Sequence, residues 1–214
     1  MGSDTDKNIL KTGTTTVGMV CKDGIVLAAD KRATAGHMIV DKRADKVHII
    51  SDDFAVTIAG NVSDAQLMIK LTRAELKLKE VRTYKKPSAK EAANLLGGIL
   101  YSSIRRPSML PGIAHFLLGG KDVHGLHLYD LFPDGSITRI TDFISSGSGS
   151  VFAYGVLETQ WKKDMSTDDA VALAVKAVNT ALQRDSASGN GIDVVVINEK
   201  EIKKVLHKEV AYNL

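Results

Sequence analysis

A short stretch near the amino terminus combines a glycine with three hydroxyl side chains. Residues 13–16 have the sequence Gly-Thr-Thr-Thr, and an alternating apolar segment follows them. A threonine hydroxyl is a weak nucleophile and needs an adjacent base. If the chain is cut between Gly13 and Thr14, the freed α-amine of Thr14 has a reference pKa near neutral pH and can be that base. The same threonines also suit an ordinary β-strand, because threonine is a common strand residue.

The first predicted hairpin carries an acidic residue toward Thr14. Apolar residues favour strands at 17–21 and 25–30, and the Asp-Gly pair between them is a strong signal for a two-residue turn. A turn centred on that pair places Ala33 opposite Thr14 and leads Asp30 past it. A slip of one residue would change the face that each side chain occupies, so the pairing stays open. Asp30 is also compatible with an ordinary charge at a strand end.

A second predicted hairpin brings an amine and a glycine to one strand end. Strands at 47–51 and 54–60 flank a weaker Asp-Asp turn signal, which sets Lys46 beside Ala59 and next to Gly60. An ammonium group and a glycine amide would then share the position where an oxyanion needs hydrogen-bond donors. Lys46 is equally typical of a solvated charge at the end of a strand.

The remaining predicted elements come in blocks rather than in strict alternation. A strand at 114–118 is expected to end at Gly119 and Gly120, and helices at 64–79 and 166–183 have apolar residues on more than one face, as helices that pack on two sides do. Blocks of hairpins and blocks of helices favour an α+β fold of antiparallel sheets with helices on their outer faces. The other predicted elements are helices at 88–105 and 151–161 and strands at 126–132, 136–141 and 192–197.

Six sequence blocks follow one another along the chain: TGTTTVG, LAADKRAT, RADKV, TIAG followed by DAQ, SGSGS with YGVLE, and QRDSASG. Together they resemble the catalytic β-subunits of the proteasome in their archaeal-type form. One block would be weak, but six at consistent spacing from Thr14 to Ile197 are specific. The resemblance implies a four-layer αββα sandwich, the fold of N-terminal nucleophile hydrolases. It also implies a pro-segment at 1–13 and a single catalytic domain at 14–214.

The resemblance implies a role for each matched residue. Thr14 resembles the nucleophile, freed by autocatalytic cleavage at Gly13-Thr14, while Asp30 and Lys46 resemble the pair that lowers the cost of deprotonating its hydroxyl. Ser148, Asp185 and Ser188 match an outer group that positions the free amine and its water, and Gly60 matches a glycine whose amide faces the oxyanion. Thr34 and Val62 match residues that bind substrate backbone, and Ala33 and Ile58 match residues that line an apolar side-chain pocket.

The implied activity is that of a threonine-type endopeptidase acting on unfolded polypeptides, with a preference for cleavage after hydrophobic residues. The implied partners are proteasome α-subunits, other β-subunits in heptameric rings stacked α-β-β-α, and an ATP-dependent unfoldase that caps the α-ring. One alternative is a non-catalytic structural ring subunit, which would be expected to lose Thr14, Lys46 or Gly13. Another is the related bacterial ATP-dependent peptidase subunit, against which the pro-segment and the SGSGS and RDSASG blocks argue.

Composition and charge argue against several other classes of function. The 28 basic and 25 acidic residues give a net charge of +3 with no basic stripe, so we expect no nucleic-acid partner. Cys21 is the only cysteine, which excludes an internal disulfide and is typical of a reducing, cytoplasmic location. No apolar run approaches the ~20 residues of a membrane span, so no membrane association is expected. No cofactor or metal is expected either, because Asp122, His124 and His127 lack a further ligand cluster.

Overall fold

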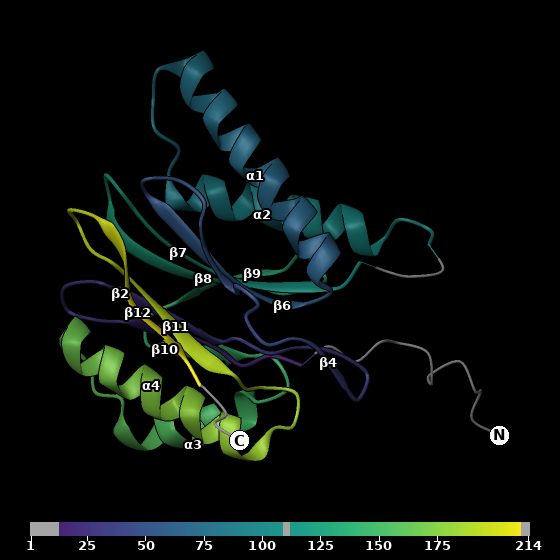
Figure 1. The fold of residues 1–214 in the computed structure, drawn as a ribbon. Coiled ribbons are helices and arrows are strands. Elements are labelled where there is room, and N and C mark those ends of the chain that lie inside the picture. The colour runs from purple at the N-terminus through teal and green to yellow at the C-terminus, as the bar shows by residue number, and fades with distance from the viewer. Residues whose placement is uncertain (1–12, 109–111, 211–214) are drawn as a thin grey trace.

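Two antiparallel five-stranded sheets lie face to face, and a pair of helices covers the outer face of each (Figure 1). The computed structural model describes residues 13–108 and 112–210. Helices α1 and α2 cover one sheet, and α3 and α4 cover the other. The predicted four-layer αββα sandwich is therefore confirmed.

The amino-terminal strand belongs to the sheet that packs on α3 and α4. The strand order in this sheet is β10-β1-β2-β11-β12, and every neighbouring pair is antiparallel. Its strands are β1 (Thr16–Val20), β2 (Ile25–Asp30), β10 (Phe143–Ser146), β11 (Gly191–Ile197) and β12 (Ile202–Glu209).

The second sheet packs on α1 and α2 and has the order β5-β6-β7-β8-β9. Its strands are β5 (Val47–Ile49), β6 (Phe54–Gly60), β7 (Ala114–Asp122), β8 (Gly125–Leu131) and β9 (Ile137–Ile140). A separate two-stranded ribbon of β3 (Ala33–Ala35) and β4 (Met38–Asp41) follows β2.

Polar side chains cap three of the four helices at their amino ends. Asn61 accepts a hydrogen bond from the Ser63 amide, and Ser88 with Glu91 forms the capping box that the sequence indicates. Ser166 caps α4 in the same way, through the Asp169 amide. The helices are α1 (Val62–Thr83), α2 (Ala89–Ile104), α3 (Ser150–Gln160) and α4 (Thr167–Arg184).

Three apolar clusters hold the four layers together. The middle cluster lies between the sheets and combines side chains such as Leu27 and Val195 from one sheet with Leu117 and Leu128 from the other. The outer two clusters join each sheet to its helices. Because both faces of each sheet are buried, β2 and β11 are apolar almost throughout, as strands covered on both sides are.

The registers of both amino-terminal hairpins differ from the predicted ones. The first turn spans Cys21 to Gly24, one residue earlier than a turn centred on Asp-Gly, so the Asp30 amide donates to the Thr15 carbonyl. In the second hairpin the Ile58 amide donates to the Lys46 carbonyl, so Lys46 lies opposite Ile58 rather than Ala59. Turn geometry decides the register, and the turn residues alone did not specify it.

One other expectation about packing was wrong. Strand β7 continues through Gly119 and Gly120 because their missing side chains leave room for Ile197 and Phe54, which a Cβ would overlap. The second apolar face of α4, with Val171 among its residues, packs inside this chain against the cluster shared with α3. The strands β3, β4, β10 and β12 were not predicted at all.

Candidate active site

The ends of both sheets meet around the side chain of Lys46, which lies just before β5 and is 4 % exposed. Its Nζ atom contacts three oxygens, which matches the three N–H groups of an ammonium. These oxygens are Thr14 Oγ1 at 2.9 Å, the Gly13 carbonyl oxygen at 3.2 Å and Asp30 Oδ1 at 2.8 Å. One amine therefore touches the proposed nucleophile, the carbonyl of the predicted cleavage site and a carboxylate.

Asp30, at the end of β2, is fully buried and has four donors around its two oxygens. Oδ1 accepts from Lys46 and from the Thr15 amide at 3.0 Å. Oδ2 accepts from the amides of Arg32 at 3.0 Å and Gly189 at 2.9 Å. These bonds satisfy the carboxylate and fix both its position and the direction in which it faces Lys46.

Burial and charge act in opposite directions on Lys46. Removal from water disfavours the ammonium and lowers the pKa of Lys46 below that of an ordinary lysine. The negative charge of Asp30 and its hydrogen bond oppose this effect without cancelling it. A lysine with a lowered pKa exchanges its proton more readily near neutral pH, which suits a group that assists proton transfer.

The hydroxyl of Thr14 lies against the peptide bond that precedes it. Thr14 Oγ1 donates to the Gly13 carbonyl oxygen at 2.6 Å, and the residue is 4 % exposed. The amide of Thr14 donates to Ser148 Oγ at 3.3 Å. The atom that would become a free α-amine thus already faces a hydroxyl group.

The predicted outer group forms a chain of hydrogen bonds behind Thr14. Ser148 Oγ donates to Asp185 Oδ2 at 2.6 Å, and Ser188 Oγ donates to the same oxygen at 2.7 Å. Ser188 also contacts Thr15 Oγ1 at 2.7 Å. Ser148 lies just before α3 and Asp185 ends α4, so the two helices that cover the sheet also position this group.

The segment before the predicted cleavage site is held closely. The Gly13 amide donates to Thr34 Oγ1 at 3.1 Å, so Thr34 contacts the backbone of the residue that precedes Thr14. A Cβ at Gly13 would overlap the Ala187 side chain. Glycine at this position therefore allows residues 13 and 14 to lie against the loop that carries Asp185 and Ser188.

The other predicted site residues make fewer defined contacts. Gly60 ends β6 with φ +103, and a Cβ there would clash with the Ile113 carbonyl. Ile58 is buried in the cluster under α1 and α2, Ala33 is half-buried at the start of β3, and Val62 begins α1. Their assigned roles in substrate binding stay predictions.

The sequence of this chain matches those of known proteins over most of its length. The family described as "Proteasome subunit" matches residues 10–197. The chain belongs to the proteasome subunit family. It is 45 % identical to the proteasome subunit beta of Ferroglobus placidus over 92 % of each chain. It is 46 % identical to that of Archaeoglobus profundus over 91 % of this chain and 92 % of the relative. The subunit of Methanothermobacter thermautotrophicus is 45 % identical over 95 % of this chain and 94 % of its own.

These relatives identify the chain as a proteasome β-subunit of the archaeal type, which is a threonine-type endopeptidase. The predicted family and enzyme class are thereby confirmed. A β-subunit assembles with α-subunits in the proteasome core particle, so the coarser part of the predicted partnership holds as well.

Arg32 is a site residue of this β-subunit to which the sequence assigned no role. Its Nε donates to Asn190 Oδ1 at 2.8 Å and its Nη1 to the Ser186 carbonyl at 2.7 Å. Arg32 therefore clamps the loop that holds Asp185 and Ser188. Gly189 is the residue that reflects this contact in the sequence, because a Cβ at position 189 would overlap the Arg32 guanidinium.

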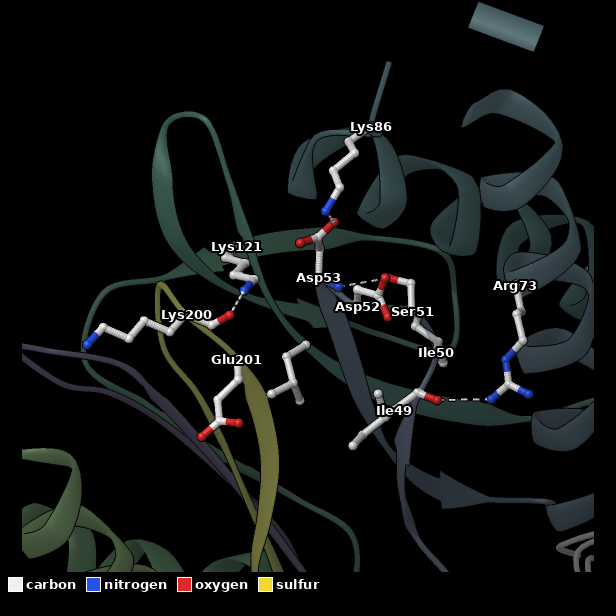
Figure 2. Close-up of a pocket in the computed structure, with 11 residues that line it drawn as sticks. Ile49, Ile50, Ser51, Asp52, Asp53, Arg73, Lys86, Lys121, Lys200 and Glu201 are labelled. Carbon is white, nitrogen blue, oxygen red and sulfur yellow. Dashed lines mark hydrogen bonds and ion pairs between the residues drawn. The ribbon is translucent and has the colours of Figure 1, made fainter. Parts of the chain in front are cut away.

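A cleft of about 680 Å³ lies at the opposite end of β6 from Gly60 (Figure 2). Two of its lysines have partners within the chain: Lys86 points at Asp53 at 2.7 Å, and Lys121 donates to the Lys200 carbonyl at 2.9 Å. The cleft is far from Thr14 along the strands and contributes nothing to the catalytic cluster.

Residues 13–108 and 112–210 contain neither a metal-binding cluster nor a membrane-spanning helix. No group of three or more histidine, cysteine or acidic side chains there is arranged to hold a metal ion. No helix in these residues combines the length and the apolarity that crossing a membrane requires. Asp122 and His127, at which the sequence predicted no metal site, bond to each other at 3.1 Å.

Proposed function

We propose that Thr14 is the nucleophile of this endopeptidase and that residues 1–13 are a pro-segment which the chain removes by its own chemistry. The observation that carries the proposal is the contact of Thr14 Oγ1 with both the Gly13 carbonyl oxygen at 2.6 Å and Lys46 Nζ at 2.9 Å. Nucleophile, proton acceptor and scissile peptide bond are within hydrogen-bond reach of one another, which is the geometry that this catalysis needs.

Self-cleavage then proceeds as a transfer of the acyl group from nitrogen to oxygen. Lys46 in its neutral form accepts the hydroxyl proton while Thr14 Oγ1 forms a bond to the Gly13 carbonyl carbon. The resulting ammonium lies 3.2 Å from the oxygen that takes up negative charge and stabilises it. The C–N bond breaks as the proton passes to the Thr14 nitrogen. Water hydrolyses the ester and releases residues 1–13 with a free carboxylate.

The freed α-amine of Thr14 becomes the base for later peptides. Thr14 attacks the substrate carbonyl, the amine carries the proton to the leaving nitrogen, and water activated by the same amine hydrolyses the acyl-enzyme ester. Ser148 contacts this nitrogen, and Asp185 and Ser188 extend the hydrogen-bond chain that orients it. A blocked amine cannot act as this base, so the intact chain is held inactive toward other peptides.

Substrate binding is assigned to the residues around this cluster. We propose that the Gly60 amide faces the oxyanion, that Thr34 and Val62 bind substrate backbone, and that Ala33 and Ile58 line the side-chain pocket. The bond from the Gly13 amide to Thr34 supports the backbone role. Two apolar residues at the pocket favour cleavage after hydrophobic residues of unfolded polypeptides.

The proposed assembly is two heptameric β-rings stacked between two α-rings, in the cytoplasm, with an ATP-dependent unfoldase on the α-ring. Exposed apolar side chains on two separate elements support extensive contacts with other subunits. Leu67 and Val81 on α1 are more than half exposed, as are Met38 and Val40 on β4. A soluble chain rarely leaves such side chains uncovered on two elements unless partners bury them.

The test is the mass of the assembled protein with and without Thr14→Ala. We expect the unaltered chain to lose residues 1–13 and the variant to keep them and hydrolyse no peptide. Thr16→Ala is the matched control, because Thr16 is an equally buried threonine whose hydroxyl contacts Ser146 rather than the cluster. An unaltered chain that stays full length in assembled rings, or a Thr14→Ala variant that still cuts, refutes the proposal.

A further inference from the structure

A second buried lysine lies beside the catalytic cluster and takes no part in it. Lys31 follows Asp30 and is 1 % exposed. Its Nζ contacts Asp193 Oδ2 at 3.1 Å and Asp45 Oδ1 at 3.3 Å. Asp193, on β11, is equally buried, whereas Asp45 is 61 % exposed. A buried lysine survives desolvation only when its charge is paired and hydrogen-bonded, and these two carboxylates supply that pairing.

The main chain of Lys31 contacts two further segments that carry site residues. Its amide donates at 3.1 Å to the carbonyl of Gly189, which follows Ser188, and its carbonyl accepts at 3.0 Å from the amide of Ala44, two residues before Lys46. Asp45, held by the Lys31 side chain, immediately precedes Lys46. Three chain segments that supply the catalytic cluster therefore converge on this one residue.

Lys31 and Ile58 together determine where the backbone of Lys46 lies. On one side the Ile58 amide holds the Lys46 carbonyl at 2.9 Å. On the other side Lys31 holds the two preceding residues through a backbone bond and an ion pair. Lys204 also reaches Asp193 and Asp45, but at 3.5 and 3.8 Å, from the surface.

We infer that Lys31 is a positioning residue for the threonine chemistry, acting through Asp45 to place the Lys46 ammonium against Thr14. The inference rests on the proposed function of Thr14 and adds a residue outside the reacting group. Lys31 touches neither Thr14 nor the scissile bond; it fixes the segment from which Lys46 projects. Asp193 anchors Lys31 to β11 and is itself held by His207 Nδ1 at 2.6 Å.

The experiment compares Lys31→Met and Lys31→Arg in the chain assembled with its α-subunit partner. The rate of loss of residues 1–13 is followed by mass, and kcat and KM are measured on a peptide ending in a fluorogenic leaving group. A misplaced catalytic group typically costs up to ~100-fold in rate. We expect Lys31→Met to lower kcat and the processing rate by about 10- to 100-fold with little change in KM. Lys31→Arg should keep both kcat and the processing rate close to those of the unaltered chain.

Lys204→Met is the matched control, since it removes a lysine that contacts the same two carboxylates from outside. It should keep kcat within about 2-fold, because an exposed ion pair contributes little. Equal loss in Lys204→Met and Lys31→Met would overturn the inference, because the loss of positive charge beside the two carboxylates would then explain both. Unchanged kcat in Lys31→Met, or failure of Lys31→Arg to rescue, would overturn it as well.

Asp45→Ala keeps the test decisive if Lys31→Met does not assemble. This change removes the exposed end of the tether and leaves the buried Lys31–Asp193 pair intact, so it should lower kcat several-fold at unchanged KM. Wild-type kcat in Asp45→Ala refutes the tether. Thr14→Ala is run in parallel: residual cleavage there refutes the proposed nucleophile, whereas an inactive Thr14→Ala beside a fully active Lys31→Met refutes only the positioning role.

Discussion

Asp30→Asn replaces a buried carboxylate by a group of nearly the same shape. Each oxygen of Asp30 accepts two hydrogen bonds, one pair from Lys46 and Thr15 and the other from Arg32 and Gly189. A side-chain amide has one oxygen and one NH₂ group. In either orientation the NH₂ group therefore faces two donors, and the Lys46 ammonium loses its paired charge.

The expected cost follows from the burial of this pair. Asp30 is fully buried and Lys46 nearly so, and breaking such a pair by removing one charge costs about 3–5 kcal/mol. In a chain of this size 1 kcal/mol shifts the melting temperature by roughly 2–4 °C. The melting temperature of Asp30→Asn should therefore fall by about 6–20 °C.

The assay is thermal unfolding of the unaltered chain and the variant under identical conditions, followed by circular dichroism. Asp53→Asn is the matched control, because it breaks an aspartate–lysine pair of similar length, 2.7 Å to Lys86, whose side chain is 62 % exposed. Its cost should stay within ~1 kcal/mol. If Asp30→Asn melts within about 2 °C of the unaltered chain, or no lower than Asp53→Asn, the account of the Asp30 site is wrong.

Three further predictions concern processing and pH. Gly13→Ala should slow loss of residues 1–13 by about 10-fold or more because its Cβ overlaps Ala187, and adding Ala187→Gly should rescue it; mass measurements that show no rescue contradict the overlap. The rate of self-cleavage should rise with pH and level off below 10.5, because burial lowers the pKa of Lys46 and the neutral amine accepts the proton; a rise that continues through 10.5 contradicts this. Burial opposes ionisation of Asp193, but hydrogen bonds from His207 and Lys31 outweigh this effect and lower the pKa of Asp193. The stability that ionised Asp193 contributes is therefore present above pH 3.8 and lost below it. Melting curves of Asp193→Asn and the unaltered chain should differ at neutral pH and converge in acid.

The layers of the fold could be predicted because their signals are local. Capping residues such as Ser88 and Ser166 and the apolar periodicity behind them identify the helices, and turn residues identify most hairpins. Strand β12 was missed because residues such as Lys203 and Lys208 make it polar, as edge strands often are. Gly119 and Gly120 were wrongly predicted to end a strand. They are required by close packing between layers, which the local sequence does not show.

The candidate site depends on packing that hairpin patterns cannot supply. Thr14 precedes a strand of one sheet and Lys46 precedes a strand of the other, so the 2.9 Å between their side chains is set by how the sheets pack. Hairpin registers alone link Lys46 only to its own partner strand. The sequence blocks identified both residues through family resemblance. Lys31 and Arg32 lie in one of these blocks, but their partners Asp193 and Asn190 lie far along the chain, so these contacts could not be predicted.

One of the three acceptors around Lys46 belongs to the segment that we propose is removed. The Gly13 carbonyl oxygen leaves with residues 1–13, whereas Thr14 and Asp30 remain. The Gly13 carbonyl thus occupies the position beside Thr14 that each later substrate carbonyl must reach. Maturation and turnover then share one nucleophile and the lysine beside it, so substitutions that displace Lys46 should slow both. The half-time of maturation would thereby become a proxy for catalytic competence that requires no external peptide.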